Sequence, residues 1–107
     1  MKSSKNILVK NKVSDKFFRL LLNIPQGKVT TYKIIADKLN ISPRYVGYLL
    51  HQNKSPKKYP CHRVVRSNGS LAIGYAFGGE SAQKRLLIKE GVVFYKNRVL
   101  KKHLHNF

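Results

Sequence analysis

The sequence predicts a small, mostly helical domain with minor strands, on three observations. Apolar residues recur at helical spacing in three segments between residues 14 and 50 and in another after residue 81. The 107 residues are 42% hydrophobic, which is ordinary for one compact domain and argues against wholesale disorder. No repeat, low-complexity tract or linker divides the chain. We therefore expect one domain at residues 14–100, between a basic N-terminal tail at 1–13 and a basic C-terminal tail at 101–107.

The first two helices are predicted from their caps and their spacing. Ser14 can cap a helix over residues 14–24, in which positions 17, 20, 21 and 24 are apolar, and a turn at residues 25–28 ends it. A second helix is expected to follow Thr31 as its N-cap and to stop at Asn40.

A third helix is predicted directly after the second. Ser42 supplies its N-cap and Pro43 its first position, and the apolar pattern continues to Leu50. Two short helices joined by residues 40–42, with the small Gly47 inside the second, are typical of a helix-turn-helix. Arg44 would lie at the start of the second of these helices, where its guanidinium could reach bases or phosphates.

The remaining elements are shorter. A polar loop at residues 51–59 precedes a strand-like stretch at 60–65 and a turn at 67–69. Ser81 is expected to open a helix that ends at Glu90, with Gly91 in a left-handed conformation after it. A strand at residues 92–95, a turn at 96–97 and apolar residues at 99–100 complete the chain.

The charge indicates a polyanionic partner. The chain has 22 Lys and Arg against 4 Asp and Glu, a formal charge of +18 spread along the sequence. Such a surface gains affinity for nucleic acid by counterion release, although composition does not separate DNA from RNA, and the alternative is a lysine-rich surface that maintains solubility. No apolar run exceeds nine residues and no secretory signal is recognisable, so we expect no membrane partner. The predicted location is intracellular: the cytoplasm and nucleoid of a prokaryote or the nucleus of a eukaryote.

The single cysteine is the candidate reactive group. One Cys excludes internal disulfides and multi-cysteine zinc sites, and we expect neither a metal nor a cofactor. A lone Cys is more often an inert buried residue, but Cys61 follows Pro60 and precedes His62 and Arg63, and nearby cations favour the reactive thiolate. His62 could equally be structural. Glu90 could orient a histidine or merely end a helix, and spacing alone does not show whether they meet.

These residues carry a family resemblance. The segments that carry it are Ile24-Pro-Gln-Gly-Lys-Val-Thr-Thr-Tyr32, Arg44-Tyr-Val-Gly47, Asn53, Pro60-Cys-His-Arg-Val-Val65, Gly69, Gly74-Tyr75, Lys84-Arg-Leu-Leu87 and Glu90-Gly91. Over about residues 15–93 the chain resembles the C-terminal, active-site domain of the O6-alkylguanine-DNA alkyltransferases. The resemblance implies a winged-helix-like, helix-turn-helix DNA-binding domain of that type.

The resemblance also implies chemical roles. Cys61 would accept the alkyl group, His62 would deprotonate the thiol through a water, and Glu90 would orient His62. Asn53 would brace the active-site turn. Tyr32 would help to rotate the phosphate and would protonate the departing guanine.

Recognition residues follow from the same resemblance. Arg44 would fill the space left by a nucleotide that is flipped out of the duplex, since the alkylated oxygen is otherwise out of reach. The pocket would contain Pro60, the Val64 carbonyl as acceptor for the guanine amino group, and Tyr75 as a wall. The DNA-binding surface, entering the minor groove, would comprise Thr31, Ser42, Arg44, Tyr45 and Lys54.

The predicted function is therefore repair of O6-alkylguanine in duplex DNA by irreversible transfer to Cys61, once per molecule, by a monomer. The alternative is an alkyltransferase-like protein, which binds alkylated guanine and recruits other repair factors. Such proteins usually carry Trp in place of the Cys, whereas this chain has Cys61 and no Trp. A helix-turn-helix transcription regulator would leave residues 60–65 unexplained.

Two departures from the family pattern are visible. Residues 1–14 are too few for the family's usual N-terminal domain, so we expect a stand-alone active-site domain. The segment at residues 74–81 is a residue or two longer than the common form, and the turn at 40–43 is shorter.

Overall fold

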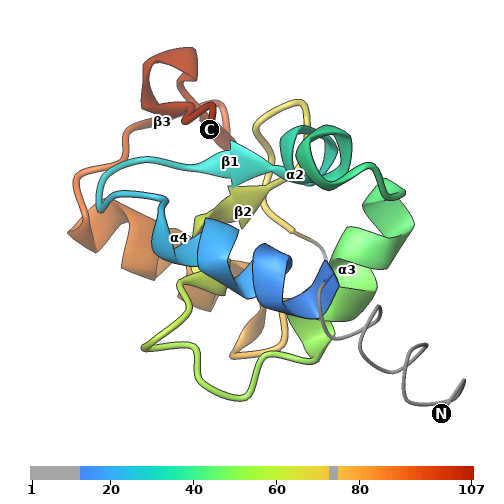
Figure 1. Cartoon of the computed structure of the whole chain (residues 1–107). Coiled ribbons are helices and arrows are strands. Elements are labelled where there is room, and N and C mark those ends of the chain that lie inside the picture. The colour runs from blue at the N-terminus through green and yellow to red at the C-terminus, as the bar shows by residue number, and fades with distance from the viewer. Residues whose placement is uncertain (1–12, 73–74) are drawn as a thin grey trace, which may run out of the picture.

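The computed structural model describes residues 13–72 and 75–107, in which helices surround one small sheet and a second small sheet lies at the edge (Figure 1). A first helix occupies residues 13–22 of the described chain. The helices that follow are α2 (Tyr32–Leu39), α3 (Pro43–His51), the 3₁₀ helix η1 (Cys61–Arg63), α4 (Gly79–Lys89) and the 3₁₀ helix η2 (Lys101–His103). The strands are β1 (Thr30–Thr31) with β2 (Val64–Val65), paired in parallel, and β3 (Phe94–Tyr95) with β4 (Arg98–Val99), paired antiparallel. The predicted class, mostly helical with minor strands, is confirmed.

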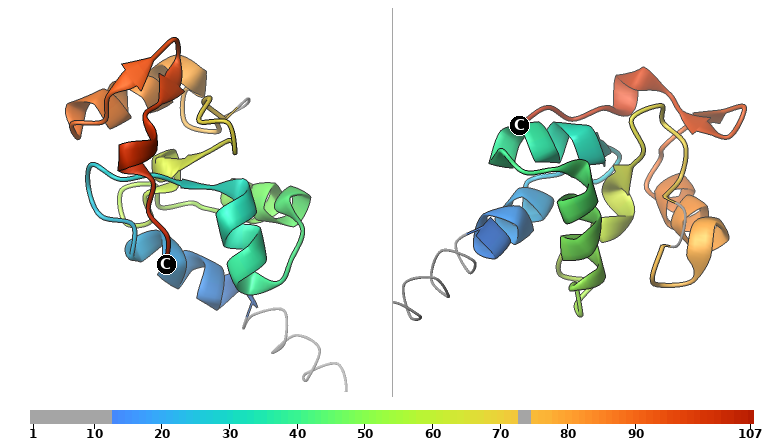
Figure 2. Two further views of the ribbon diagram at one scale, coloured as in Figure 1. Left: turned by 90° about the horizontal axis from the view of Figure 1, so that it is seen from above. Right: turned by 90° about the vertical axis from the view of Figure 1, so that its right-hand side faces the viewer.

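The helix-turn-helix forms as its caps predict. The Thr31 hydroxyl accepts a hydrogen bond from the Ile34 amide at 3.0 Å, and the Ser42 hydroxyl accepts one from the Tyr45 amide at 3.1 Å. Between the helices, Asn40 adopts the left-handed conformation with φ of 57° and ends α2. α2 and α3 pack together at a steep angle (Figure 2).

Strand β2 separates two hydrophobic cores. Successive residues of a strand point to opposite faces, so Val64 packs into one core and Val65 into the other, and both are fully buried. The first core joins the residue 13–22 helix, α2 and α3, and its buried members are Phe17, Leu21, Ile24, Ile35, Ala36, Val46, Leu49 and Val64. The second lies against α4 and the C-terminal strands and comprises Val29, Val65, Leu87, Val92 and Val99.

Several predicted boundaries are wrong for local reasons. The strand-like stretch at residues 60–65 is extended only at Val64–Val65, because the Val64 amide donates to the Cys61 carbonyl and closes a 3₁₀ turn over Cys61–Arg63. The first helix ends at residue 22 rather than 24, since the residue before Pro25 is disfavoured in the helical conformation. α4 begins at Gly79 rather than at Ser81.

The residue that precedes α4 is Gly78, its N-cap. It has φ of 114°, and an added Cβ would lie 2.8 Å from the Cβ of Ala82, so a larger residue there would be strained and crowded. At the other end of α4, Gly91 is left-handed as expected, with φ of 92°. The strand predicted at residues 92–95 covers only Phe94–Tyr95, because the amides of residues 92 and 93 donate to the Leu87 carbonyl and to the His103 ring instead.

The last seven residues pack against the domain, although a basic tail was expected. The Val29 amide donates to the His103 carbonyl at 2.8 Å, and the His105 amide donates back to the Val29 carbonyl at 2.7 Å. The buried ring of His103 accepts from the Val93 amide through Nε2 and therefore carries its proton on Nδ1, which donates to the Gly27 carbonyl. The bonds to His103 and His105 satisfy the backbone N–H and carbonyl of Val29. The N-terminal tail expected at residues 1–13 lies outside the described residues, apart from the helical Val13.

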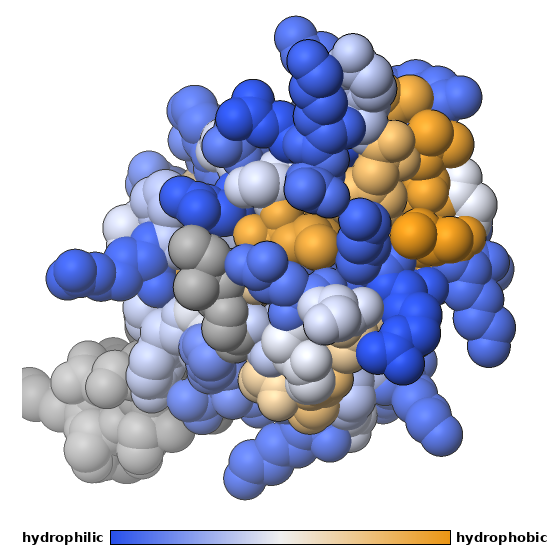
Figure 3. All heavy atoms as spheres, turned by 180° about the vertical axis from the view of Figure 1, so that it is seen from behind, coloured by the Kyte–Doolittle hydropathy of each residue, from blue (hydrophilic) through white to orange (hydrophobic). Residues whose placement is uncertain are grey.

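The surface of the described chain is largely polar. Figure 3 shows one face on which hydrophilic side chains dominate and surround smaller apolar areas. Within residues 13–72 and 75–107, no helix is both long enough and apolar enough to cross a membrane.

The first core can be tested through Phe17, which is fully buried. We expect Phe17→Ala to lower the free energy of unfolding by about 3–5 kcal/mol, because the substitution removes buried apolar surface and leaves a cavity. Leu22→Ala, in the same helix at a position 52% exposed, is the matched control and should change it by less than about 0.5 kcal/mol. Urea denaturation measures both variants. Equal losses would contradict the assignment of Phe17 to the core.

Candidate active site

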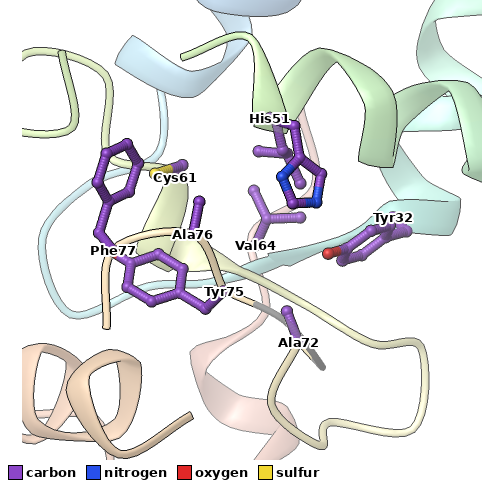
Figure 4. A pocket seen from close by; sticks show the side chains of 9 residues that line it. Tyr32, His51, Cys61, Val64, Ala72, Tyr75, Ala76 and Phe77 are labelled. Carbon is purple, nitrogen blue, oxygen red and sulfur yellow. The ribbon is translucent and has the colours of Figure 1, made fainter. Parts of the chain in front are cut away.

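A small pocket with a cavity volume of about 30 Å³, partly open to solvent, lies where the helix-turn-helix meets the rest of the domain (Figure 4). Its lining comes from α2, α3, η1, β2 and the loop before α4, and consists of Tyr32, Leu50, His51, Cys61, Val64, Ala72, Tyr75, Ala76 and Phe77. Figure 4 shows Cys61 and Tyr32 on opposite sides, with the Tyr32 hydroxyl pointing into the space between them.

Cys61 is a buried thiol rather than an exposed thiolate. Its residue is 5% exposed, and burial raises the pKa of the thiol, while hydrogen bonds from the side chains of Asn53 and Tyr75 oppose part of the rise. The expectation of a cation-stabilised thiolate is therefore wrong for the unbound protein. Burial is the largest cause of the rise, and the guanidinium of the neighbouring Arg63 is bonded to Glu90 and to the Ile24 carbonyl.

Asn53 holds the loop that leads to the cysteine. Its Nδ2 donates to the Tyr59 carbonyl at 2.9 Å, and its Oδ1 accepts from the Ser55 amide at 3.0 Å. The Cys61 amide donates to the same Tyr59 carbonyl at 2.7 Å. Asn53 and Cys61 thus donate to the same Tyr59 carbonyl, which couples the 3₁₀ turn at Cys61 to the loop that precedes it.

His62, Arg63 and Glu90 form a network behind the cysteine. Nε2 of His62 lies 3.0 Å from Oε2 of Glu90, while Arg63 donates to both carboxylate oxygens, through Nε at 2.9 Å and Nη2 at 2.7 Å. Burial alone would raise the pKa of Glu90, but the hydrogen bonds from Arg63 and His62 lower it below its usual value. Burial lowers the pKa of His62. At neutral pH the carboxylate therefore accepts the proton on Nε2 of a neutral His62, and Nδ1 carries the free lone pair.

Two tyrosine hydroxyls stay protonated at neutral pH. Burial raises the pKa of Tyr32 above its ordinary value, and the charge of a Cys61 thiolate would raise it further. The pKa of Tyr75 is raised more strongly, by burial and by its contact with Cys61. Both hydroxyls can therefore act as hydrogen-bond donors.

The other two predicted pocket residues differ in position. Val64 lines the pocket, and its carbonyl accepts from Nε2 of Gln83 at 3.0 Å. Pro60 is buried but does not line it; together with His62, Arg63 and Phe77 it borders a neighbouring groove.

Sequence reasoning missed several residues of this region. They are the pocket-lining His51, Ala76 and Phe77, the Glu90 partner Arg63, and the buried Gln83. Gln83 had a usable signal, because it precedes Leu87 by four residues and so shares the inward face of α4.

The predicted DNA-contacting residues fall into two groups. Ser42, Arg44 and Lys54 are exposed and Tyr45 is half-buried. Arg44 and Tyr45 occupy the first turn of α3, where the Tyr45 ring stacks on Tyr48 with centroids 5.7 Å apart, and Lys54 lies beyond its other end. Thr31 is 4% exposed and its hydroxyl caps α2, so its side chain is not available to DNA and that prediction is wrong.

Comparison with known proteins places this geometry in a family. Residues 12–92 match the family model of the 6-O-methylguanine DNA methyltransferase DNA-binding domain. The chain is 51% identical over 79 residues to the methylated-DNA–protein-cysteine methyltransferase of Pyrobaculum aerophilum, a match that covers 74% of this chain and 52% of the relative. It spans about half the length of the archaeal relatives that it matches.

Solved structures agree. S. pombe Atl1, crystallised with damaged DNA containing O6-carboxymethylguanine, superposes with a TM-score of 0.77 at 28% identity, covering 91% of this chain and 97% of that one. The O6-methylguanine-DNA methyltransferase of Pyrococcus kodakaraensis gives a TM-score of 0.64 at 38% identity, covering 74% and 46%. This chain therefore belongs to the family of the 6-O-methylguanine DNA methyltransferase DNA-binding domain.

Proposed function

We propose that this protein repairs O6-alkylguanine in duplex DNA by transferring the alkyl group to Cys61. The observation that carries the proposal is the position of the Cys61 thiol, across the pocket from the Tyr32 hydroxyl (Figure 4). A guanine seated between them would present its O6 substituent to a nucleophile and its ring to a proton donor.

The transfer is a displacement at carbon. The thiol proton passes to Nδ1 of His62, directly or through a water, and the sulfur forms a bond to the alkyl carbon as the bond from that carbon to O6 breaks. The electron pair remains on guanine, which takes a proton from the Tyr32 hydroxyl. The Glu90 carboxylate stabilises the imidazolium that forms on His62. The thioether product has no route back to the thiol, so each molecule reacts once.

Binding of DNA is assigned to the first turn of α3 and to the net charge of +18. Flipping a base costs a few kcal/mol, and an exposed Arg44 inserted in its place would offset part of that cost. Tyr45 and Lys54 would contact the backbone, and Ser42 would act by holding α3 in place. We propose entry through the minor groove by a monomer, in whichever compartment holds the DNA.

A second candidate function is recognition without transfer. It is favoured by the likeness to Atl1, which extends over 97% of that chain. In this reading the pocket binds the alkylated base, Cys61 does not react, and the bound complex recruits other repair factors. The two functions differ in whether a covalent bond forms.

The first prediction separates them. Mixed with a duplex that contains one O6-methylguanine, the protein should gain the mass of one methylene group at Cys61, in a one-to-one ratio to the lesion. Intact-protein mass spectrometry with peptide mapping measures this, and Cys61→Ser is the control that should still bind but gain no mass. Tight, lesion-selective binding by the unsubstituted protein without a mass increase would favour the second function.

The second prediction concerns the protonation of the thiol. Because burial raises the pKa of Cys61, its thiolate absorbance should appear at a higher pH than that of free cysteine. Tyr75→Phe removes a hydroxyl that donates to the sulfur while keeping the ring, and should move the midpoint further upward. Subtracting the Cys61→Ser titration isolates the signal, since the chain has one Cys. A midpoint at or below that of free cysteine would contradict the buried-thiol assignment.

The third prediction tests Arg44. Arg44→Ala should slow methyl transfer on duplex DNA by roughly tenfold or more and on a single strand by less than about threefold, because a single strand needs little extrusion work. Lys16→Ala removes the same charge from an exposed position on the first helix and serves as the control. Equal losses on duplex and single strand would show that Arg44 contributes charge and not base replacement.

A further inference from the structure

Gln83 is a fully buried polar side chain in α4 that the proposed chemistry does not use. We infer that it is a positioning residue, which fixes the gap between the Cys61 turn and the loop that carries Ala72. The inference rests on the proposed function for its kinetic consequence but not for its structural basis.

The hydrogen bonds of Gln83 join three segments. Its Nε2 donates to the carbonyls of His62 and Val64, each at 3.0 Å, and its Oε1 accepts from the Ala72 amide at 3.0 Å. Both amide hydrogens are thereby used. The amide has one workable orientation, because a flipped group would set its oxygen against two carbonyl oxygens and its nitrogen against an N–H.

These contacts lie directly behind the pocket. Cys61, Val64 and Ala72 line the pocket, whereas Gln83 does not. Its two donated bonds hold the carbonyls of His62 and Val64, in the backbone that follows Cys61. The bond that it accepts holds the loop that carries Ala72. Gln83 therefore sets the distance between the Cys61 turn and the loop that carries Ala72 without lining the pocket itself.

The chemistry of the contacts predicts which replacements succeed. Met has a similar length but no N–H donor and only a weakly accepting sulfur. It would therefore lose the bonds to the carbonyls of His62 and Val64 and the bond from the Ala72 amide. Lys can still donate to the two carbonyls but cannot accept from the Ala72 amide. Comparing Gln83→Met with Gln83→Lys thus separates the placement of the Cys61 turn from the placement of the loop.

Single-turnover kinetics with the O6-methylguanine duplex test the inference, at a temperature where every variant is folded. Gln83→Met should lower the transfer rate constant at saturating DNA by about tenfold to a hundredfold, because misplacement by about 1 Å has effects of that order, with the Kd for DNA changed less than about threefold. Gln83→Lys should lose less of the rate than Gln83→Met, because it keeps the donations to the Cys61 turn while releasing the Ala72 loop. Leu87→Ala, one turn along α4 and also fully buried, should lower the melting temperature while leaving the rate constant within about threefold.

Two results would overturn the inference: an unchanged transfer rate constant in Gln83→Met, or a loss of rate in Leu87→Ala that matches it. If the unsubstituted protein transfers no methyl group, the proposed function fails and the inference is judged by binding. Gln83→Met should then lose selectivity for the lesion over undamaged duplex, and Gln83→Lys should lose less of it. Unchanged selectivity in Gln83→Met would overturn the inference in that case.

Discussion

The position of the cysteine depends on the carboxylate of Glu90. This one side chain accepts hydrogen bonds from Arg63 and His62, the two residues that follow Cys61, and Nη1 of Arg63 donates to the Ile24 carbonyl at 2.8 Å. The network thereby joins the end of α4, the 3₁₀ turn and the end of the first helix. Removing one member would leave the other charge unpaired in a partly buried site. The turn therefore has little freedom to move while the domain stays folded.

The pocket lies at the boundary between two cores. Val64 and Val65 face different cores from one short strand, and β1 fixes that strand by parallel pairing of Thr30 with Val64. The helix-turn-helix contributes Tyr32 and His51 to the lining, and the other part contributes Ala72 and Tyr75 through Phe77. The helix-turn-helix and the Cys61 turn thus meet at the pocket (Figure 4).

The sequence predicted correctly the elements whose ends are set by contacts between residues close together in the chain. Thr31, Asn40, Ser42 and Pro43 set the helix-turn-helix through caps and backbone preferences that need no distant partner. The Pro-Cys-His-Arg-Val segment identified the candidate site, and the structure brings His62 and Glu90 together as the resemblance implied. The roles of these residues in chemistry stay predictions.

Long-range contacts account for what the sequence did not reveal. The 3₁₀ turn at Cys61 is held by Gln83 and Glu90, which are more than 20 residues away from the cysteine, and the C-terminal residues are ordered by Val29. The protonation of Cys61 was predicted wrongly because the sequence shows the neighbouring cations but not the burial of the thiol, which raises its pKa. Arg63 is next to His62 in sequence, yet its guanidinium is directed to Glu90.

The burial of Cys61 has a consequence for the lifetime of the protein in a cell. Peroxides and disulfides react with thiolates, and they react fastest with exposed ones. If the protein reacts only once, as proposed, each oxidation of Cys61 would inactivate one molecule. A thiol that is 5% exposed and whose pKa is raised by burial would react more slowly with such oxidants than an exposed thiolate.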